Sequence, residues 1–499
     1  MDLRPESILK NYNSDLLNKS AAIQQLISVI EKSSNLNHRI ESLKLLVELH
    51  TKKEKIYELI ENLLISDSDS RVRCLAAKIM KDHFLNKAFN AMKWSLAHET
   101  SINCLITIIK ALGEINNEEA MDLLNNDIQK VESSPFKTHI EKYLEKNPNL
   151  YQNGREIAEI LNNYYILKFL EKKFDKILYT LDEGKIIELD LSNIGSHVFE
   201  YNMLNYLPDF VCKLKSLRKL DLKFNRIRKC PNTIKNLKNL KFLDVSYNKL
   251  KKIPQEIKYL HELEYLNIKN NKLKELPPTI GDLISLNIFN LRSNNLIEIP
   301  NTIGSLFNLQ ELILHGNQIK RLPKNLGNLK NLELLDLGSN NFEHIPDAIR
   351  KLKNLKRLGL GGNRLIDVPF WIGNLTSLKE LHLYDNIIEN LPESISSLKS
   401  LEELTLWNNN LKFLPKALTC LKSLQRLNLS WNQISELPEW IAEIKSLEIL
   451  SLWGNNLEEI PASLEKLKNL RILDLNFNQN IKIPSNLASL KKNGLIIYK

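Results

Sequence analysis

The sequence contains little cysteine and no long apolar stretch. Its 499 residues include five cysteines. None of them belongs to a C-x-x-C pair, and no histidine lies at zinc-ligand spacing from one. This excludes a disulfide-stapled small domain and a zinc finger, and it favours reduced, mostly buried thiols in a cytosolic protein. Because no run of about 18 apolar residues occurs, we expect no membrane span.

The first residues also lack the features of a secretion signal. "MDLRPESILK" has neither a basic n-region nor an apolar h-region. We therefore expect a cytoplasmic protein. Hydrophobic residues at 43% and charged residues at 26% are typical of a folded protein, and the length allows two or more domains.

The positive charge is unevenly distributed. The formal net charge is +10. Residues 1–180 hold equal numbers of basic and acidic side chains, so the whole excess lies in residues 181–499. Whether this excess forms a patch depends on how that part folds.

A strict 23-residue repeat occupies most of this second part. It starts with "LRKLDLKFNRIRKCPNTIKNLKN" and continues with "LKFLDVSYNKLKKIPQEIKYLHE". The frame, L-x-x-L-x-L-x-x-N-x-L-x-x-I-P-x-x-I-x-x-L-x-x, fills residues 217–469 with 11 regular coils, and a degenerate twelfth begins at Leu470. The ninth position is always asparagine: Asn225, Asn248, Asn271, Asn294, Asn317, Asn340, Asn363, Asn386, Asn409, Asn432, Asn455 and Asn478. The fifteenth is always proline, from Pro231 to Pro484.

Physical chemistry assigns a role to each part of the frame. The "LxxLxL" segment predicts a short strand whose leucines face a core that only stacked coils can bury. The asparagine amide can bond backbone groups of its own and neighbouring coils, and proline can start the return segment. The pattern resembles the leucine-rich repeat. The resemblance implies a horseshoe with a parallel sheet on its concave face and return segments on its convex face.

The two ends of this solenoid are irregular. The first coil begins near residue 186 and carries an insertion at 196–205, which is either a cap or a binding loop; we favour a cap. At the other end, we expect "GLIIYK" to cap the last coil. Lysines one residue before the coil end lie at a corner of the return face, where we expect them to serve solubility. They are Lys238, Lys330, Lys353, Lys399, Lys422, Lys445 and Lys468.

The N-terminal part shows helical periodicity and a looser repeat. "SDSRVRCLAAKIMKDHF" aligns with "ETSINCLITIIKALGEI", and "NHRIESLKLLVELH" and a fainter "SSPFKTHIEKYL" fit the same series. These segments resemble HEAT repeats, which implies an α-α superhelix of about four helix pairs. "NPNLYQNG" is the candidate linker, and "REIAEILNNYYILKFLEKKF" is expected to cap the first coil. We therefore divide the chain into a HEAT-like domain at 1–150, a linker and cap at 151–185, and a leucine-rich repeat domain at 186–499 with its C-terminal cap at 470–499.

A search for catalytic and cofactor motifs finds none. The glycine-rich "RLGLGGNRL" places Gly359, Gly361 and Gly362 on a concave strand, not before a helix, and no G-K-[ST] follows. It offers either a strip of exposed backbone that a partner approaches or positions without a side-chain constraint. His315 and His382 lie three coils apart, too far for one metal site. We expect no enzyme, no cofactor, no metal and no small-molecule substrate.

Aspartates and cations alternate on the early concave strands. Asp221 and Asp244 are neighbours across coils and could mimic a catalytic carboxylate pair; we favour a solvated ladder neutralised by Lys219, Lys223 and Lys241. Lys223, Lys269 and Arg292 form a modest basic area that acidic residues interrupt. For that reason we do not expect nucleic acid as the main ligand.

Exposed aromatic residues mark the late coils. Positions seven and eight of five consecutive coils carry Tyr384, Trp407, Trp431, Trp453 and Phe477. Rings about 4.8 Å apart can form one patch, and such patches are typical of partner binding, although stacking without a partner is an alternative. We predict a partner-binding surface on the concave face. It consists of these five aromatics with His382, Gly359, Gly361, Lys223, Lys269 and Arg292.

The strict frame with "LPxxIxxLxx" is similar to the intracellular Ras-suppressor type of leucine-rich repeat. This resemblance implies a scaffold or adaptor without enzymatic activity, whose concave face holds a protein partner. A small GTPase or another signalling protein is the best candidate on this basis. Two alternatives stay open: a GTPase regulator with activating activity, and a nucleic-acid-associated scaffold.

Overall fold

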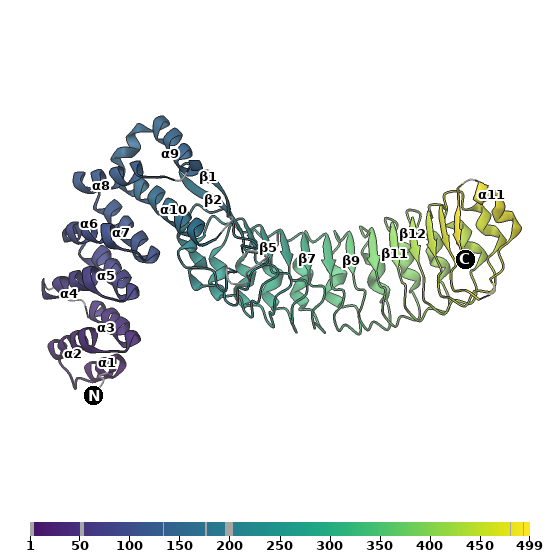
Figure 1. Cartoon of the computed structure of the whole chain (residues 1–499). Coiled ribbons are helices and arrows are strands. Elements are labelled where there is room, and N and C mark those ends of the chain that lie inside the picture. Colours follow the sequence, from purple (N-terminus) through teal and green to yellow (C-terminus); the bar gives the residue numbers. More distant parts are fainter. Residues whose placement is uncertain are drawn as a thin grey trace. The chain divides into compact units, whose positions relative to one another are not determined.

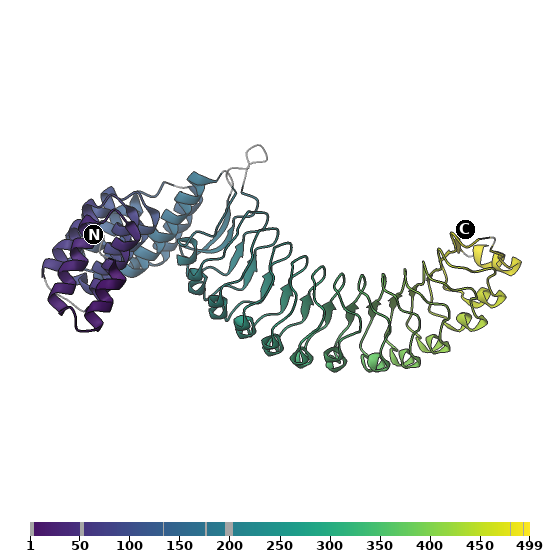
Figure 2. The same ribbon diagram turned by 90° about the horizontal axis from the view of Figure 1, so that it is seen from below.

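The computed structural model describes residues 4–49, 54–132, 134–174, 177–194, 203–479, 481–492 and 494–499. The chain divides into two compact units. The first comprises Met1–Ile187 and Asp209–Leu214, and the second comprises Glu188–Pro208 and Lys215–Lys499. Helices build the first unit, and short strands run through the second (Figure 1, with a turned view in Figure 2).

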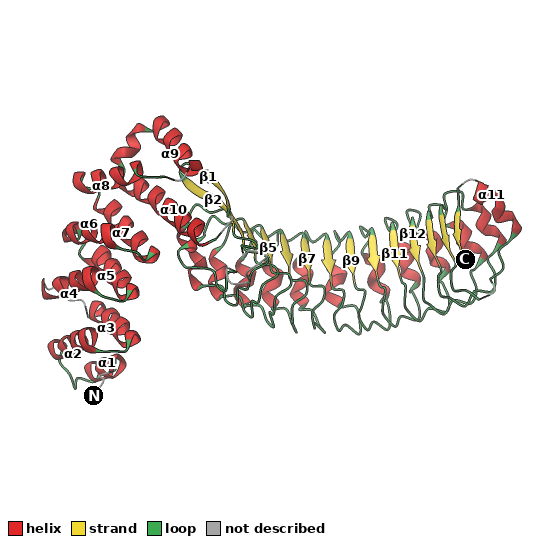
Figure 3. Cartoon of the chain, in the orientation of Figure 1, coloured by secondary structure: helices red, strands yellow, loops and turns green. Residues whose placement is uncertain are grey.

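The first unit is a series of short antiparallel helices, as the periodicity predicts (Figure 3). Asparagine or aspartate side chains accept a backbone N–H at the start of several of them, for example Asn35 at α3 and Asp69 at α5. The helices are α1 (Pro5–Asn13), α2 (Lys19–Lys32), α3 (Leu36–Glu48), α4 (Glu54–Ser66), α5 (Ser70–His83), α6 (Phe89–His98), α7 (Ile102–Ile115), α8 (Glu118–Gln129), α9 (Ser134–Lys146) and α10 (Gly154–Lys173), with short 3-10 turns η1 (Leu85–Lys87) and η2 (Pro148–Gln152).

The aligned sequence segments form equivalent helices. They are α3, α5 and α7, which pack in a row. The fainter fourth copy forms α9, but the helix that packs along α7 is α10. Glycine makes this contact possible, because a Cβ added to Gly113 would lie 2.5 Å from the Cβ of Ala158 in α10. The amide of Gly154 also donates to Oδ1 of Asn116 at 2.8 Å. Helix α10, the predicted cap, is thus an integral part of the first unit.

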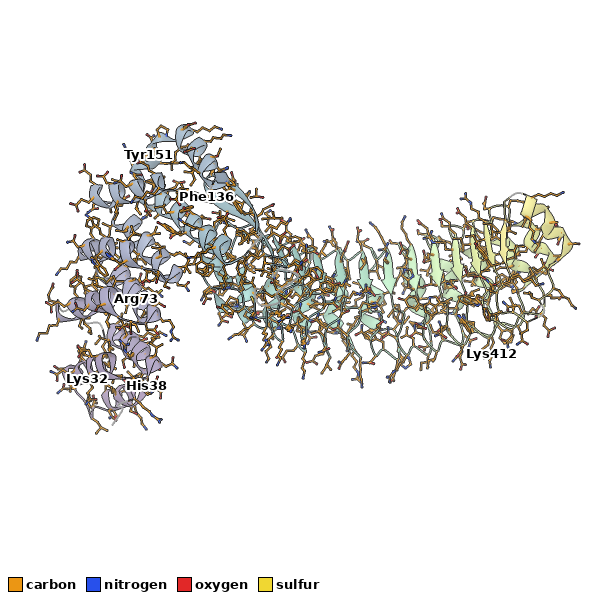
Figure 4. All side chains as sticks on the ribbon, viewed as in Figure 1. Lys32, His38, Arg73, Phe136, Tyr151 and Lys412 are labelled. Atoms are coloured by element: carbon orange, nitrogen blue, oxygen red, sulfur yellow. The ribbon has the colours of Figure 1, made fainter. Side chains whose placement is uncertain are left out.

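Two buried ion pairs connect successive helical repeats. Arg39 of α3 pairs with Asp67, and Arg73 of α5 pairs with Glu99 at 2.9 Å. Figure 4 shows Arg73 among the helices of the first unit. The side chain of Glu99 is only 2% exposed. Burial opposes its ionisation, but hydrogen bonds from Arg73 and the Ser101 amide lower the pKa of Glu99 to about 2.

We predict that Arg73→Ala lowers the free energy of unfolding by about 3 kcal/mol, because it leaves a buried carboxylate without its cation. Arg71, whose pair with Asp69 is largely exposed, is the matched control, and Arg71→Ala should leave the denaturation midpoint unchanged. The depressed pKa of Glu99 adds stability above the ordinary glutamate pKa, and this contribution disappears as pH falls toward 2. Urea titrations of both variants between about pH 7 and pH 3 test this; equal midpoints for the two variants would contradict it.

In the second unit, every regular coil contributes one short strand. Consecutive strands pair in parallel and in register, so that Leu335 lies opposite Leu312 and Leu358. The strands follow chain order across one sheet. They are β1 (Leu178–Asp182), β2 (Lys185–Asp190), β3 (Lys219–Asp221), β4 (Phe242–Asp244), β5 (Tyr265–Asn267), β6 (Ile288–Asn290), β7 (Glu311–Ile313), β8 (Leu334–Asp336), β9 (Arg357–Gly359), β10 (Glu380–His382), β11 (Glu403–Thr405), β12 (Arg426–Asn428), β13 (Ile449–Ser451), β14 (Ile472–Asp474) and β15 (Ile496–Tyr498). Strand β1 and the first residues of β2 belong to the first unit, and the parallel pairs run from β2 to β15.

From η5 to η16, each return segment contains one 3-10 turn that starts directly after the frame proline. Pro300, for example, has a φ of −66° and precedes η8, which fits the fixed φ of proline. The turns are η4 (Val211–Lys213), η5 (Asn232–Asn236), η6 (Gln255–Tyr259), η7 (Pro278–Asp282), η8 (Asn301–Ser305), η9 (Lys324–Asn328), η10 (Asp347–Lys351), η11 (Phe370–Asn374), η12 (Glu393–Ser397), η13 (Lys416–Cys420), η14 (Glu439–Glu443), η15 (Ala462–Lys466) and η16 (Ser485–Leu487). In the second unit the strands line the inner side of the curve and these turns line the outer side (Figure 2).

The frame asparagines form a continuous buried ladder. In a central coil, Nδ2 of Asn340 donates to the carbonyl oxygens of Leu314 and Leu337 at 3.0 Å each. Its Oδ1 accepts the amide of Ile319 at 3.0 Å. The same bond to the preceding coil occurs at all twelve asparagines, from Asn225 to Asn478. This confirms the predicted role of the ninth position.

The lysines at the coil corners connect neighbouring coils. Nζ of Lys330 donates to the carbonyl oxygen of Lys351 in the next coil at 3.2 Å, and Lys353 donates in the same way to Asn374 at 3.0 Å. Lys399 and Lys445 make equivalent bonds. The expectation that these side chains serve only solubility is therefore wrong for four of the seven. Their ammonium groups satisfy carbonyls at the ends of 3-10 turns.

The C-terminal "GLIIYK" caps the last coil as predicted, since β15 pairs with β14 and follows α11 (Ala488–Lys492). The predicted insertion lies mostly outside the described residues. Its described end is tied to the next coil, because the amide of Arg226 donates to the carbonyl oxygen of Leu204 at 2.9 Å.

We predict that Asn340→Ala lowers the free energy of unfolding by about 3 kcal/mol, since it leaves several buried backbone groups without a partner. Asn331→Ala is the matched control, because Asn331 makes a single exposed bond to the Phe307 carbonyl oxygen. Chemical denaturation followed by circular dichroism measures both changes. Similar losses for the two variants would show that the ladder does not hold the coils together.

Candidate functional site

The eighth frame position has an unusual backbone in every regular coil and in the last one. All twelve residues have positive φ, between 51° and 69°. In eleven of the twelve, from Phe224 to Gly454, the amide donates to a carbonyl oxygen of the next coil, as in Trp431, whose amide donates to the carbonyl oxygen of Trp453 at 2.6 Å. Glycine and asparagine adopt this conformation readily, whereas a bulky side chain is strained there by about 1–2 kcal/mol. Four coils nevertheless carry an aromatic residue: Phe224, Tyr247, Trp431 and Phe477.

The late aromatic residues form two groups instead of one patch. Tyr384 and Trp407 stack with a centroid distance of 5.0 Å and an interplanar angle of 3°. Trp431, Trp453 and Phe477 form a tilted cluster with centroid distances from 5.7 to 6.5 Å. Among the described residues no ring contact joins the two groups. The cause is the shift from position seven to position eight at Trp431, which moves its ring toward the edge of the sheet.

The second group is the more exposed of the two. Relative exposures are 49% for Trp431, 37% for Trp453 and 74% for Phe477, while Tyr384 and Trp407 are half-buried. Trp431 and Phe477 also border a hollow along the adjoining turns, together with Glu458. We define Trp431, Trp453 and Phe477 as the aromatic cluster.

A second hollow, of about 340 Å³, lies in the middle of the concave face. It brings together six of the predicted site residues: Lys269, Arg292, Gly359, Gly361, His382 and Tyr384. Ile313 and Leu334 from neighbouring strands also line it, although they carry no signal in the sequence beyond their outward frame positions. We define this region as the central hollow.

The glycines of the central hollow do not form a strip of exposed backbone, as one sequence interpretation expects. Gly361 is buried beneath the ring of Tyr384, and a Cβ added there would lie 2.4 Å from ring atoms. A Cβ on Gly359 would lie 2.7 Å from Oδ1 of Asp336. Side chains of neighbouring coils lie against the backbone at both glycines, so a larger residue at either position would require Asp336 or Tyr384 to move.

Charges inside the central hollow are partly compensated. Nε of Arg357 donates a hydrogen bond to Oε2 of Glu380 at 2.6 Å, and this bond lowers the pKa of Glu380. Asp336 lies 3.5 Å from Nδ1 of His315. Burial opposes its ionisation, but the bonds from His315 and the Gly338 amide lower the pKa of Asp336.

Two groups at the rim of the central hollow remain available to a partner. Arg292 is exposed, and its side chain makes no ion pair or hydrogen bond within the described parts of the chain. Burial and the nearby charge of Asp336 raise the pKa of Tyr384, so the phenol keeps its proton at neutral pH. His382 is engaged by Thr405 and Glu380 at 3.0 and 3.3 Å.

The early aspartates are not a solvated ladder. Asp221 and Asp244 are only 5% and 6% exposed. Lys223 pairs with Asp221 at 2.9 Å, whereas Asp244 accepts a bond from Asn267 at 2.9 Å. The other two lysines expected to neutralise them have different partners: Lys219 lies over the ring of Phe242 and Lys241 pairs with Glu264.

Phe224 and Tyr247 are exposed aromatic residues that the sequence interpretation overlooked. They stack with a centroid distance of 4.4 Å and are 44% and 37% exposed. Nζ of Lys269 lies 5.3 Å from the centroid of the Tyr247 ring. The signal was available in the frame, because both residues occupy position eight, as Trp431 and Phe477 do.

The described residues offer no cluster of three or more histidine, cysteine or acidic side chains suited to a metal ion. Within the same residues, no helix combines the length and apolarity needed to cross a bilayer. None of the five cysteines forms a disulfide, and only Cys104 and Cys212 are fully buried. The expectation that most thiols are buried is therefore wrong.

Comparison with known proteins settles the family. A family model described as a leucine-rich repeat region matches residues 189–286, 301–387 and 381–492, which is more than half of the chain. The chain belongs to the leucine-rich repeat proteins. No curated protein matches it.

Several solved structures share the fold of this leucine-rich repeat protein. A leucine-rich repeat protein of Leptospira interrogans is 37% identical, with a TM-score of 0.53, and the match covers 60% of this chain and 82% of that one. The internalin InlF of Listeria monocytogenes is 22% identical, with a TM-score of 0.53, over 64% and 91% of the two chains. The PEPR1–AtPEP1 structure is 26% identical, with a TM-score of 0.54, over 68% of this chain and 55% of that one.

We predict that Phe477→Asn leaves the protein at least as stable as the wild type, and about 1 kcal/mol more stable than Phe477→Ala. Both variants remove the same exposed ring, but only asparagine tolerates the left-handed backbone, as Asn270 and Asn408 do in other coils. Thermal and urea denaturation of the three proteins test this. A clear loss of stability in the asparagine variant would show that the ring serves packing instead.

Proposed function

We propose that the chain is a non-enzymatic scaffold or adaptor that holds a protein partner on the concave face of its leucine-rich repeat unit. The observation that carries this proposal is the aromatic cluster. Trp431 and Phe477 occupy strained left-handed positions and are still 49% and 74% exposed. Strain that persists at an exposed site is typical of function, and exposed Trp and Phe are typical binding anchors.

The central hollow supports the same proposal. It offers an apolar floor, the cation of Arg292 and the hydroxyl of Tyr384 within one concavity. The aromatic cluster lies farther along the same inner curve of the second unit. A partner with an apolar knob and a polar loop would contact both regions. In this proposal nine of the eleven predicted site residues belong to the two contact regions, and Trp407 and Lys223 belong to neither.

The finer identity of the partner rests on resemblance. The 23-residue frame is similar to the Ras-suppressor type of leucine-rich repeat, and the first unit is similar to HEAT repeats, so a small GTPase or another signalling protein is the first candidate. The PEPR1–AtPEP1 structure, as its name states, pairs such a fold with AtPEP1, which agrees with a protein ligand. The alternative of a GTPase regulator predicts faster hydrolysis in the presence of this chain.

We predict that the variant Trp431→Ser, Trp453→Ser, Phe477→Ser loses one or more partners in affinity capture from the native host followed by mass spectrometry. Each loss should exceed tenfold, because truncation of a central aromatic anchor costs about 2 kcal/mol or more. The matched control is Phe370→Ser, Phe413→Ser, which removes two rings that are 76% and 72% exposed on return segments. Circular dichroism must show that both variants remain folded.

Retention of every partner by the triple variant would overturn the proposal. A loss shared with the control variant would instead indicate nonspecific hydrophobic capture. For a captured GTPase, nucleotide hydrolysis with and without the full chain separates the two roles. An unchanged rate supports a scaffold, and an accelerated rate supports the regulator.

A further inference from the structure

We propose that the first three regular coils bind single-stranded nucleic acid along one edge of the sheet. The edge consists of six cations at frame positions ten and twelve, beside the aromatic pair Phe224 and Tyr247. The cations are Arg226, Arg228, Lys249, Lys251, Lys272 and Lys274. We name them the basic edge. The proposal is independent of the aromatic cluster and of the protein partner.

The backbone arranges the basic edge in two columns. Position eleven is buried in all three coils, as Ile227, Leu250 and Leu273 show, so positions ten and twelve face outward. The amide of Lys249 donates to the carbonyl oxygen of Ile227, and the amide of Lys272 donates to that of Leu250, each at 2.9 Å. These bonds set coil-to-coil spacing at about 4.8 Å. The two columns therefore form a compact area of positive charge.

Carboxylates do not neutralise the four lysines of the basic edge. In the described parts of the chain, the side chains of Lys249, Lys251, Lys272 and Lys274 make no hydrogen bond or ion pair, and all four are exposed. Positions seven, eight, ten and twelve of the three coils contain no acidic residue. The basic edge ends in the next coil, where Asn295 and Ile297 occupy frame positions ten and twelve.

The aromatic pair gives the charged area a surface for stacking. Phe224 and Tyr247 lie parallel within 19° and stay exposed in left-handed positions, where asparagine or glycine would be less strained. Nζ of Lys269 lies over the Tyr247 ring at 5.3 Å from its centroid, so the more exposed ring of Phe224 offers the face on which a base can stack. Cations interleaved with stacked rings are the combination that binds single strands without sequence preference.

The residue types of the basic edge favour nucleic acid over an acidic protein or an anionic membrane as the ligand. Lysine, which supplies four of the six cations, is depleted in protein–protein interfaces, whereas it is a common phosphate ligand. An anionic membrane would need protruding apolar side chains to insert, but the two rings here lie against each other and are only 44% and 37% exposed. A flexible phosphate backbone with free bases fits both the charge and the rings.

The test is binding of the full chain to fluorescein-labelled oligothymidylate and oligouridylate of about 12 nucleotides, measured by fluorescence anisotropy between about 50 and 200 mM NaCl. About six phosphate contacts predict a slope of about −4 in log K against log salt. Replacing Lys249, Lys251, Lys272 and Lys274 with glutamine should reduce the magnitude of this slope by about 3. The lysines are exposed and unpaired, so the fold should remain intact, as circular dichroism would show.

Two further variants make the result specific. The charge-matched control replaces Lys416, Lys422, Lys466 and Lys468, which are exposed on return segments away from frame positions ten and twelve, and it should keep the wild-type affinity and slope. Phe224→Asn with Tyr247→Asn should weaken binding about tenfold per stacked base and leave the slope unchanged, because it removes stacking but no charge.

The remaining outcomes overturn the proposal. Equal losses in the basic-edge and control variants would mean binding by net charge alone. Stronger binding to phosphatidylserine-containing vesicles or to poly-L-glutamate than to the oligonucleotides would identify a membrane or an acidic protein as the ligand. Unchanged affinity in the double asparagine variant would show that the rings take no part.

Discussion

The hydrogen bonds of the buried frame asparagines are the interaction on which the second unit depends. Each amide satisfies backbone groups of its own coil and of the preceding one, as Asn340 does for Leu337, Leu314 and Ile319. A buried turn without these bonds would leave polar groups unpaired. Because the turn is held in this way, the residue before each asparagine is forced into the left-handed region. Both exposed aromatic surfaces follow from this constraint.

The two aromatic surfaces share a physical origin but differ in their surroundings. Trp431 and Phe477 lie near apolar and acidic neighbours, which suits an apolar protein anchor. Phe224 and Tyr247 lie beside the unpaired lysines of the basic edge instead. The central hollow lies between them in the sequence and combines small residues with a free guanidinium. One repeated backbone thus presents three chemically different regions through substitutions at positions that the core does not use.

The repeat made most of the fold predictable, because strand, turn and return segment follow from the positions of leucine, asparagine and proline in a fixed frame. The finer features of the site were less predictable. The burial of Gly361 depends on the rotamer of Tyr384 in the next coil, and the frame carries no rotamer information. Trp407 occupies frame position seven and Trp431 occupies position eight. This difference of one residue points the Trp431 ring in another direction and separates the two rings. The contact of α10 with α7 depends on Gly113 and Gly154, which periodicity alone does not relate.

The lysine bridges on the outer side have a mechanical consequence. Hydrogen bonds hold neighbouring strands together on the inner side, and Lys330, Lys353, Lys399 and Lys445 span the gap between 3-10 turns on the outer side. Because neighbouring coils are hydrogen-bonded on both the inner and the outer side, a change in the angle between them would break bonds on one side. The curvature of the later coils is then set before any ligand arrives, so little conformational entropy is lost when one binds.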